Sequence, residues 1–420
     1  MSAALAYDEA LALVLAEAAP LAIERRAPQD ALGLVLAEAV ASEADLPPFD
    51  NSAMDGFALR AAGEVLAAGR EFDVSGAQVA GDEAAAADDG AWEIMTGARM
   101  PGGLDSVVPV ERVEVLERDK GGRPLRIRLS ADVPSGDNVR LRGEDIASGA
   151  PAVAAGSRIG AAELMVLASL GVTAVAVRRR ARVAVINTGR ELVDDPARPL
   201  ASGEIRNSNG PFLAARAAAA GADIVLRETV GDEPEMFLAA LERALGAGAD
   251  VVLSTGAVSM GRHDFVPDAL RGIGADIRFH KVAIRPGRPL LFARLAGGAL
   301  FFGLPGNPVS SAVGLRFFAE PALRAMAGMA AERPLRMPLA DAYRKRAPLR
   351  FHLKGRVELV DGCLRARVLQ GQESFKVLPL LAANAWIVVP PESMALEAGG
   401  MVDVHGLGHL EAPLIGGVLE

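Results

Sequence analysis

Between residues 183 and 327 the sequence alternates short apolar runs with helical segments, and this alternation constrains the fold more than any other feature. Strand-like runs lie at 183–186, 224–226, 251–253 and 300–302, and helical patterns follow over 209–220, 232–245 and 308–327. Strands that alternate with helices form a mostly parallel, doubly wound sheet. We therefore predict an α/β region whose ligands bind outside the carboxyl ends of its strands.

The rest of the sequence has a different texture on each side of this region. Residues 7–19 have helical spacing, residues 47–146 are rich in Gly, Asp and Val in short strand-like runs, and the chain beyond residue 334 is again β-like. We therefore expect a multidomain α/β protein. The predicted helical linking domain is in two pieces, 1–46 and 147–177. The β-rich insert between them spans 47–146, the α/β domain spans 178–328, and the C-terminal β domain spans 329–420.

Composition excludes several classes of protein. Apolar residues make up 51% of the chain and charged residues 23%, which excludes intrinsic disorder. A net charge of −9 gives no reason to expect nucleic acid or an anionic membrane as partner. The single cysteine, Cys363, excludes an intrachain disulfide and fits a reducing compartment.

No segment of the sequence has the pattern of a targeting or membrane-spanning element. Acidic residues stand near the N-terminus, where a signal peptide needs a basic start. The longest uncharged run, 295–315, contains two prolines and several glycines, and it fits a strand, a loop and the start of a helix. We expect a cytoplasmic protein without a membrane segment.

Three turns at predicted strand ends are candidates for binding a phosphate-bearing ligand. Small residues there allow backbone N–H groups to approach a ligand closely, and a helix N-terminus favours an anion. Any one of these turns could be an ordinary connection, but three on one sheet edge favour a ligand site. Their residues are Thr188 and Gly189, then Ser254, Thr255 and Gly256, then Pro305, Gly306, Asn307 and Pro308.

A basic stretch between residues 280 and 289 carries Lys281, Arg285 and Arg288. Its prolines and glycine restrict the backbone, so that these cations are presented from a rigid loop. In an acidic chain, such a group favours capture of a small oxyanion or phosphate, although a solvated surface loop is the alternative.

Carboxylates near the same strand ends could hold Mg²⁺, which prefers oxygen ligands and bridges to phosphate. The candidates are Glu191, Asp232 and Asp264, of which Asp232 and Asp264 could instead cap the helices that follow them. The sequence contains no HExxH, GxSxG, Walker or GxGxxG pattern, which argues against a zinc hydrolase and several nucleotide-binding classes.

Seven segments, taken together and in order, resemble one known family. They are PPFDNSAMDGFAL (47–59), IMTGARMPGGLDSVV (94–108), RGEDI (142–146), INTGREL (186–192), STGAVSMGRHDF (254–265), KVAIRPGRP (281–289) and GLPGNPVS (303–310). This order is similar to the molybdopterin molybdenumtransferases, the MoeA and gephyrin E-domain family, from about residue 7 to the C-terminus.

The resemblance implies an elongated homodimer whose molybdopterin-binding α/β domain is MogA-like, similar to the separate adenylyltransferases. It implies that adenylylated molybdopterin and molybdate are bound, that the pyrophosphate bond is cleaved with Mg²⁺, and that AMP leaves as molybdenum is inserted at the dithiolene. The implied partners are a molybdopterin adenylyltransferase and downstream molybdoenzyme maturation proteins.

The resemblance also implies roles for individual residues. The metal would bind Asp232 and Asp264. Ser259 would face the oxyanion, and Arg350 and Ser374 would contribute to molybdate binding, as would Arg288. The implied catalytic residues are Asp55, Thr96, Asp145, Glu191, Asp232, Asp264, Lys281 and Arg285.

The sequence departs from the family pattern at three places. Gly256-Ala257 replaces a double glycine, Arg285 and Arg288 stand where lysines are common, and Leu378-Pro379 occupies the position of a serine pair. Two other functions remain open. They are a molybdopterin-binding scaffold or carrier without turnover, which the altered C-terminal turn favours, and a molybdopterin adenylyltransferase, which the extra domains disfavour.

Overall fold

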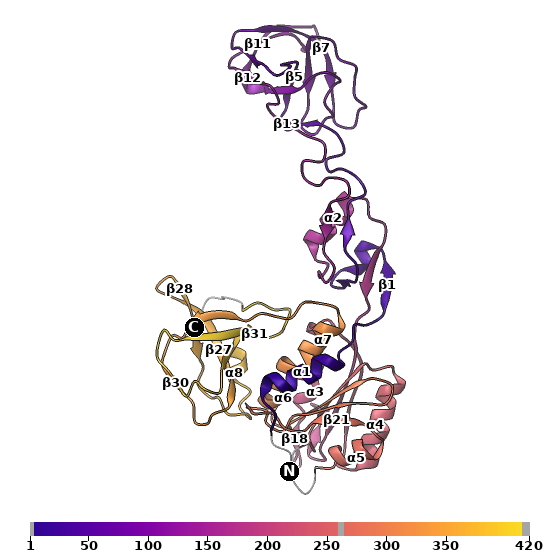
Figure 1. The fold of residues 1–420 in the computed structure, drawn as a ribbon, viewed down its shortest axis with the longest axis vertical. Coiled ribbons are helices and arrows are strands. Elements are labelled where there is room, and N and C mark those ends of the chain that lie inside the picture. Colours follow the sequence, from indigo (N-terminus) through magenta and orange to yellow (C-terminus); the bar gives the residue numbers. More distant parts are fainter. Residues whose placement is uncertain (1–3, 259–263, 414–420) are drawn as a thin grey trace.

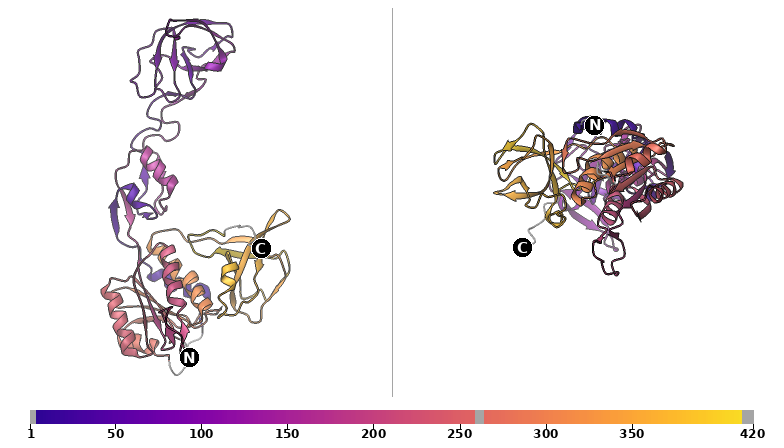
Figure 2. Two further views of the ribbon diagram at one scale, coloured as in Figure 1. Left: turned by 180° about the vertical axis from the view of Figure 1, so that it is seen from behind. Right: turned by 90° about the horizontal axis from the view of Figure 1, so that it is seen from below.

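The computed structural model describes residues 4–258 and 264–413, and it is elongated (Figures 1 and 2). A compact α/β part and a C-terminal β part lie side by side at one end, and a β-sheet lies at the far end of an arm. Among the described residues, no helix is both long enough and apolar enough to cross a membrane.

The α/β part is built on a sheet with the strand order β19-β16-β20-β24-β23-β21. The first four strands are parallel, and β23 and β21 complete the sheet in antiparallel pairing. Separate apolar clusters cover its two faces, with Val183 and Val185 facing one and Ala184 and Ile186 facing the other. This arrangement confirms the doubly wound α/β class. The strands are β16 (Arg182–Thr188), β19 (Asp223–Val230), β20 (Val251–Thr255), β21 (Asp276–Phe279), β23 (Leu291–Arg294) and β24 (Leu300–Leu304).

Helices pack on both faces of this sheet. The predicted helix over 308–327 is interrupted by a π-helical turn, Leu315–Ala319, which divides it into two pieces. The small pair β17 (Leu192–Val193) and β18 (Ile205–Arg206) lies beside the sheet. The helices are α3 (Asn209–Ala219), α4 (Pro234–Gly246), α5 (Val266–Gly272), α6 (Pro308–Gly314) and α7 (Glu320–Met326).

The N-terminal helix α1 (Tyr7–Glu17) belongs to the packing of the α/β part. Its buried residues Ala10 and Val14 share a cluster with Val183 and Phe318. The following residues form the middle sheet, with the strand order β1-β15-β2, where β1 is Ile23–Arg26, β15 is Val175–Arg178 and β2 is Val35–Leu36. The segments expected to form a helical linking domain contain both helices and strands. The first holds α1, which packs with the α/β part, and short strands; the second holds α2 (Ala161–Ser169) and short strands.

The far end of the arm is the distal sheet, with the strand order β10-β11-β7-β8-β5-β9. Its strands are β5 (Gly56–Leu59), β7 (Glu71–Gln78), β8 (Ala91–Ile94), β9 (Ser106–Pro109), β10 (Val113–Arg118) and β11 (Pro124–Leu129). Short pairs of strands accompany it and the arm below it: β4 (Asn51–Ser52) with β13 (Val139–Arg140), β6 (Val65–Leu66) with β12 (Val133–Pro134), and β3 (Val40–Ala41) with β14 (Pro151–Val153).

The C-terminal part is a sheet with the strand order β22-β27-β29-β31-β25, and β28 also pairs with β27. The pair β26 (Tyr343–Arg344) and β30 (Ala395–Leu396) and the short helix α8 (Pro379–Ala382) complete it. Its strands are β22 (Ile284–Arg285), β25 (Leu335–Pro338), β27 (Arg350–Val360), β28 (Cys363–Val368), β29 (Ala385–Val389) and β31 (Met401–Gly406).

A buried network of charges joins the π-helical turn and the start of α7 to the C-terminal part. Arg316 is 2% exposed and donates to Glu332 at 2.6 and 2.8 Å and to the Gly406 carbonyl at 2.9 Å. Burial opposes ionisation of Glu332, but hydrogen bonds from His405 and Arg316 outweigh it and lower its pKa to about 2. Glu320 lies in the same network, where burial raises its pKa to about 7.

His409 gives the fold a dependence on pH that a single substitution isolates. Burial lowers its pKa to about 4, while its Nε2 lies 3.1 Å from the Ala220 carbonyl oxygen. As the pH falls from 6.5 to 4, this histidine becomes protonated in the unfolded chain but stays neutral in the folded chain. The free energy of unfolding therefore decreases by roughly 3 kcal/mol. Glu320 acts in the opposite direction as the pH falls from 7.

The variant His409→Gln keeps an amide donor for Ala220 and removes the titration. We expect its free energy of unfolding, relative to the unsubstituted chain, to rise as the pH is lowered from 7 to 4. Urea denaturation at a series of pH values measures this difference. A difference that stays constant over that range would contradict the assignment.

Candidate active site

Three strand ends lie side by side at the carboxyl edge of the α/β sheet. In the register of the sheet, Asn187 is opposite Thr255, and Thr255 is opposite Leu304. Asn187 donates to the Thr255 hydroxyl at 2.6 Å, and the Thr188 hydroxyl donates to the Thr255 carbonyl at 3.2 Å. The three turns singled out in the sequence therefore form one continuous edge.

Gly256 is required where two of these turns meet. Its φ is +91°, and a Cβ atom there would lie 2.4 Å from the Thr188 carbonyl oxygen. The next residue, Ala257, has a φ of +47°, a left-handed conformation that disfavours a side chain. The departure from a double glycine is thus accommodated in a conformation that suits glycine better.

Asparagine side chains brace this edge, and the sequence did not single them out. Asn207 is 8% exposed and donates to Asn187, Asp194 and Thr229. Asn209 is the first residue of α3, after the N-cap Ser208, and its side chain donates to the Gly306 carbonyl at 2.8 Å. The signal available in the sequence was only the cluster of asparagines at 207–209, which is also typical of a turn.

Two of the predicted acidic residues lie at the first turn, and the third follows the second turn in the sequence. Glu191 folds back over Gly189, since its carboxylate oxygens lie 2.7 and 2.8 Å from where a Gly189 Cβ would be. Asp232 accepts the backbone N–H of Arg190 at 3.3 Å, and the N-cap of α4 is Glu233. Asp264 is half-buried, and the N-cap of α5 is Phe265. The alternative reading of Asp232 and Asp264 as N-caps is therefore wrong.

These acidic residues do not by themselves form a metal cage. Within residues 4–258 and 264–413, no three His, Cys, Asp or Glu side chains are grouped so that they could hold one metal ion. Mg²⁺ commonly takes one or two carboxylates and completes its shell with water and substrate phosphate. A pair of aspartates fits that pattern, so a magnesium ion would need phosphate from the substrate. Ser259, predicted to face the oxyanion, lies outside the described residues.

The third turn leads directly into a helix. Asn307 occupies the N-cap position of α6 and Pro308 its first helical position, as the sequence predicted. Pro305 is buried, whereas Gly306 and Asn307 are exposed. The backbone N–H groups of this helix start therefore lie at the sheet edge.

The basic stretch forms a strand of the C-terminal sheet, β22. Ile284 pairs with Arg350 and Arg285 with Phe351, and the Arg350 N–H donates to the Ala283 carbonyl at 3.2 Å. The Val282 N–H donates to the Arg288 carbonyl and closes the loop. Arg285 and Arg288 are exposed, and Lys281 is half-buried. The cations are thus presented from a fixed backbone at the seam between the two parts of the chain.

Arg350 and Ser374, predicted from the resemblance, lie at this same seam. The Arg350 guanidinium lies 4.2 Å from the centre of the Tyr7 ring, and the Ser374 carbonyl accepts the N–H of Val309, in the first turn of α6, at 3.0 Å. Leu378 and Pro379 begin helix α8, and Leu378 is 73% exposed.

A cavity of about 520 Å³ opens beside Arg285 in the C-terminal part. Arg344 and Arg346 line it together with Arg285, Phe351 and Tyr343. Two carboxylates, Asp341 and Glu373, also line the cavity, so its three guanidinium groups leave a net positive charge that suits an oxyanion. The sequence gave no reason to select Arg344 or Arg346, because they come close to Arg285 only through the pairing of β22 with β27.

The loop that carries Ser374 is held by one buried lysine. Lys354 is 1% exposed, and its ammonium donates to the carbonyls of Gly371, Glu373 and Lys376 at 2.5, 3.3 and 3.0 Å. The Gln372 side chain pairs with the backbone of Lys354 at 3.0 and 2.8 Å.

The variant Lys354→Met is expected to destabilise the chain by roughly 1–3 kcal/mol, because three backbone carbonyls lose a charged donor that is itself buried. We expect limited proteolysis to cleave the 371–376 loop faster in this variant. Lys376→Met, which removes an exposed lysine of the same loop, is the matched control. Equal cleavage rates in the two variants would contradict a holding role for Lys354.

The predicted residues of the distal sheet lie far from this seam. Thr96 donates its backbone N–H and its hydroxyl to one oxygen of Asp55, at 2.7 and 3.0 Å, and these bonds lower the pKa of that carboxyl. Asp145 is exposed in the return segment of the arm, and among the described residues no hydrogen bond or ion pair joins it to Asp55 or Thr96. Figure 1 shows the distal sheet at the opposite end of the molecule from the α/β part.

Comparison with known proteins decides the family. Three family models match in order: the MoeA N-terminal region (domain I and II) at residues 5–171, a probable molybdopterin binding domain at 184–325, and the MoeA C-terminal region (domain IV) at 336–407. A molybdopterin molybdenumtransferase of Synechococcus elongatus is 38% identical over 413 residues, covering 96% of this chain and 100% of that protein. The chain belongs to the molybdopterin molybdenumtransferase family.

Other relatives agree with this assignment. A protein of the same name from Bacillus subtilis is 34% identical, over 90% of this chain and 88% of its own. The crystal structure of the molybdopterin biosynthesis moeA protein from Pyrococcus horikoshii OT3 superimposes with a TM-score of 0.79 at 27% identity, covering 96% and 99% of the two chains. The family and the fold class predicted from the sequence are both confirmed.

Proposed function

We propose that this chain is a molybdenum insertase, a transferase that uses adenylylated molybdopterin and molybdate and releases AMP. One observation carries the proposal. The small-residue edge formed by Thr188, Gly189 and Gly256 lies on the same α/β part as the turn at 305–308, and that turn is bonded to the Ser374 loop beside the basic strand. A phosphate-binding edge and a cationic seam are the two surfaces that this pair of substrates requires.

The roles that we propose follow from the chemistry of each surface. The absence of side chains at Gly189 and Gly256 lets a phosphate group approach the sheet edge closely, and the N-terminal end of α6 favours its negative charge. The arginines of the seam neutralise molybdate and orient it towards the dithiolene. Asp232 and Asp264 would hold Mg²⁺, which when bound supplies charge neutralisation at the pyrophosphate.

The predicted catalytic residues of the distal sheet can take part in the reaction only if they reach an active site on another copy of the chain. Asp55 and Thr96 lie at the far end of the arm, so they cannot reach this chain's own sheet edge in the observed shape. We propose a homodimer in which the distal sheet of one copy meets the α/β part of the other. We also propose that the chain divides into its domains after residues 46, 146, 177 and 328.

We further propose a cytoplasmic enzyme that receives its substrate from a molybdopterin adenylyltransferase and delivers its product to molybdoenzyme maturation proteins. The direct test mixes the purified chain with adenylylated molybdopterin, Mg²⁺ and molybdate and measures AMP released per subunit. Release that requires molybdate and is lost in Asp264→Ala supports the insertase. Tight pterin binding without AMP release would favour a scaffold or carrier instead.

A further inference from the structure

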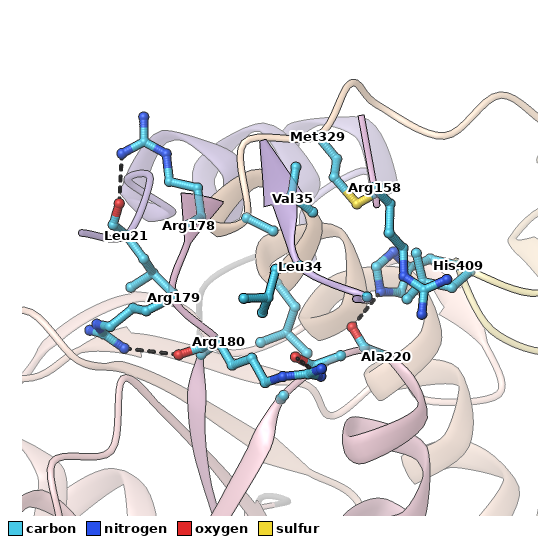
Figure 3. Close-up of a pocket in the computed structure, with 17 residues that line it drawn as sticks. Leu21, Leu34, Val35, Arg158, Arg178, Arg179, Arg180, Ala220, Met329 and His409 are labelled. Carbon is cyan, nitrogen blue, oxygen red and sulfur yellow. Dashed lines mark hydrogen bonds between the residues drawn. The ribbon is translucent and has the colours of Figure 1, made fainter. Parts of the chain in front are cut away.

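A small cavity lies at the junction of the middle sheet, the α/β part and the C-terminal segment (Figure 3). It has a volume of about 30 Å³, room for two or three water molecules. It borders Ala181, at the amino end of β16, whereas the candidate active site lies at the carboxyl end. Seven residues of strand separate the two by about 20 Å, so the cavity is a distinct place.

Arginine side chains converge on this cavity from the middle sheet. A Cβ atom placed on Gly33 would lie 3.4 Å from Nη2 of Arg158 and 3.4 Å from Nη2 of Arg180. The two guanidinium groups are therefore no more than twice that distance apart. Arg178 also lines the cavity and donates to the Leu21 carbonyl at 2.7 Å.

No described carboxylate forms an ion pair with any of these three arginines. The neighbouring Arg179 provides the contrast, because Asp250 binds it in a bidentate pair at 2.6 and 2.7 Å. The Nε of Arg178 is buried without a hydrogen-bond partner. Like charges gathered in this way repel one another unless an anion lies between them.

Helix ends at the junction account for part of this positive charge but not for all of it. The cavity is lined by Ala220 and Gly221 at the C-terminal end of α3 and by Ala327 at the end of α7, and Arg180 donates to the Gly221 carbonyl at 3.4 Å. Each helix end carries about half a negative charge, so two ends offset about one of the three guanidinium groups. Arg180 also lines a neighbouring cavity with Glu24, Asp30 and Asp223, and none of these described carboxylates forms an ion pair with it. His409 also lines the cavity, and its low pKa keeps it neutral near pH 7.

We propose that this junction binds a small tetrahedral oxyanion of the phosphate class, held between Arg158 and Arg180. Guanidinium groups match the oxygens of such an anion with paired N–H donors. Arg158 is exposed, so the anion has access from solvent. Because Arg158 belongs to the arm and His409 and Leu410 to the C-terminal segment, a bound anion joins the arm to the rest of the chain.

Isothermal titration with inorganic phosphate at constant ionic strength tests the site in the full chain. Arg158 makes no hydrogen bond to a described residue, so Arg158→Gln leaves the fold intact and a melting curve in chloride buffer checks this. The matched control is Arg25→Gln, which removes an exposed arginine of β1 that forms no ion pair with a described residue. We expect one saturable phosphate site whose affinity falls by about tenfold or more in Arg158→Gln and is retained in Arg25→Gln.

Phosphate could also bind at the candidate active site, so the titration is repeated in Arg285→Gln. We expect the junction site to persist there and to be lost in the double variant with Arg158→Gln. Competition with AMP distinguishes the two sources of the ligand. AMP displaces inorganic phosphate from a site that accepts the phosphate of a nucleotide, and it leaves inorganic phosphate bound at a site that accepts only the free anion. Identical phosphate isotherms in the unsubstituted chain and in Arg158→Gln would overturn the proposal, and Arg180→Gln serves as its second test.

Discussion

Replacing Arg285 by glutamine is expected to lower molybdate-dependent release of AMP by about a hundredfold to a thousandfold. The guanidinium lines the cavity of about 520 Å³ and lies 5.6 Å from the centre of the Phe351 ring. The backbone of β22 stays paired with β27 in the variant, so the loss is one of charge at a fixed place. Initial rates of AMP formation against molybdate concentration measure the effect.

The control for this prediction is Arg356→Gln. Arg356 lies on β27, the strand that pairs with β22, is opposite Arg367 in register, and does not line the cavity. We expect it to release AMP at the rate of the unsubstituted chain. If Arg285→Gln also kept that rate, the cationic seam would have no part in the reaction, and the proposed position of molybdate would be wrong.

Replacing Arg316 by leucine is expected to cost about 3–5 kcal/mol of stability, the largest effect expected of a single substitution away from the site. The side chain is 2% exposed and satisfies both oxygens of Glu332 and the Gly406 carbonyl. Its removal leaves Glu332, whose pKa is about 2, charged and without this partner. The melting temperature of the chain measures the loss.

A double variant distinguishes the cost of leaving Glu332 without its partner from the cost of losing Arg316 itself. Replacing Arg316 by leucine and Glu332 by glutamine together removes the cation and the anion, so we expect the double variant to be more stable than Arg316→Leu alone. A single variant that melts within about one degree of the unsubstituted chain would show that the buried pair contributes nothing.

The local part of the fold could be predicted from the sequence. Apolar runs such as 183–186 and 251–253 are strands because they are buried on both faces, and the pattern shows this without any tertiary information. The parts that were missed depend on partners distant in sequence. Strand β22 is two residues long and is stabilised by β27, and α1 packs against a sheet that begins 165 residues later.

The residues of the candidate site also differ in whether the local sequence could predict them. The glycine turns at 189 and 256 were predicted because each follows a strand directly, and their alignment follows from parallel pairing. The roles of Asn207 and Lys354 were not, because nothing local distinguishes a buried lysine that binds three carbonyls from an exposed one. The π-helical turn at 315–319 likewise has no signature in the sequence that periodicity detects.

The arm leaves and re-enters the α/β part at neighbouring points. Helix α1 precedes the arm and still packs against the α/β core, and the Arg179 N–H donates to the Ala22 carbonyl at 3.1 Å where the two ends of the arm meet. Residues 23–178 therefore form one continuous insertion between Ala22 and Arg179, which are hydrogen-bonded to each other. The whole arm could therefore be gained or lost as one insertion without rethreading the sheet, and a short hairpin from Ala22 to Arg179 would be enough to close a chain without the arm.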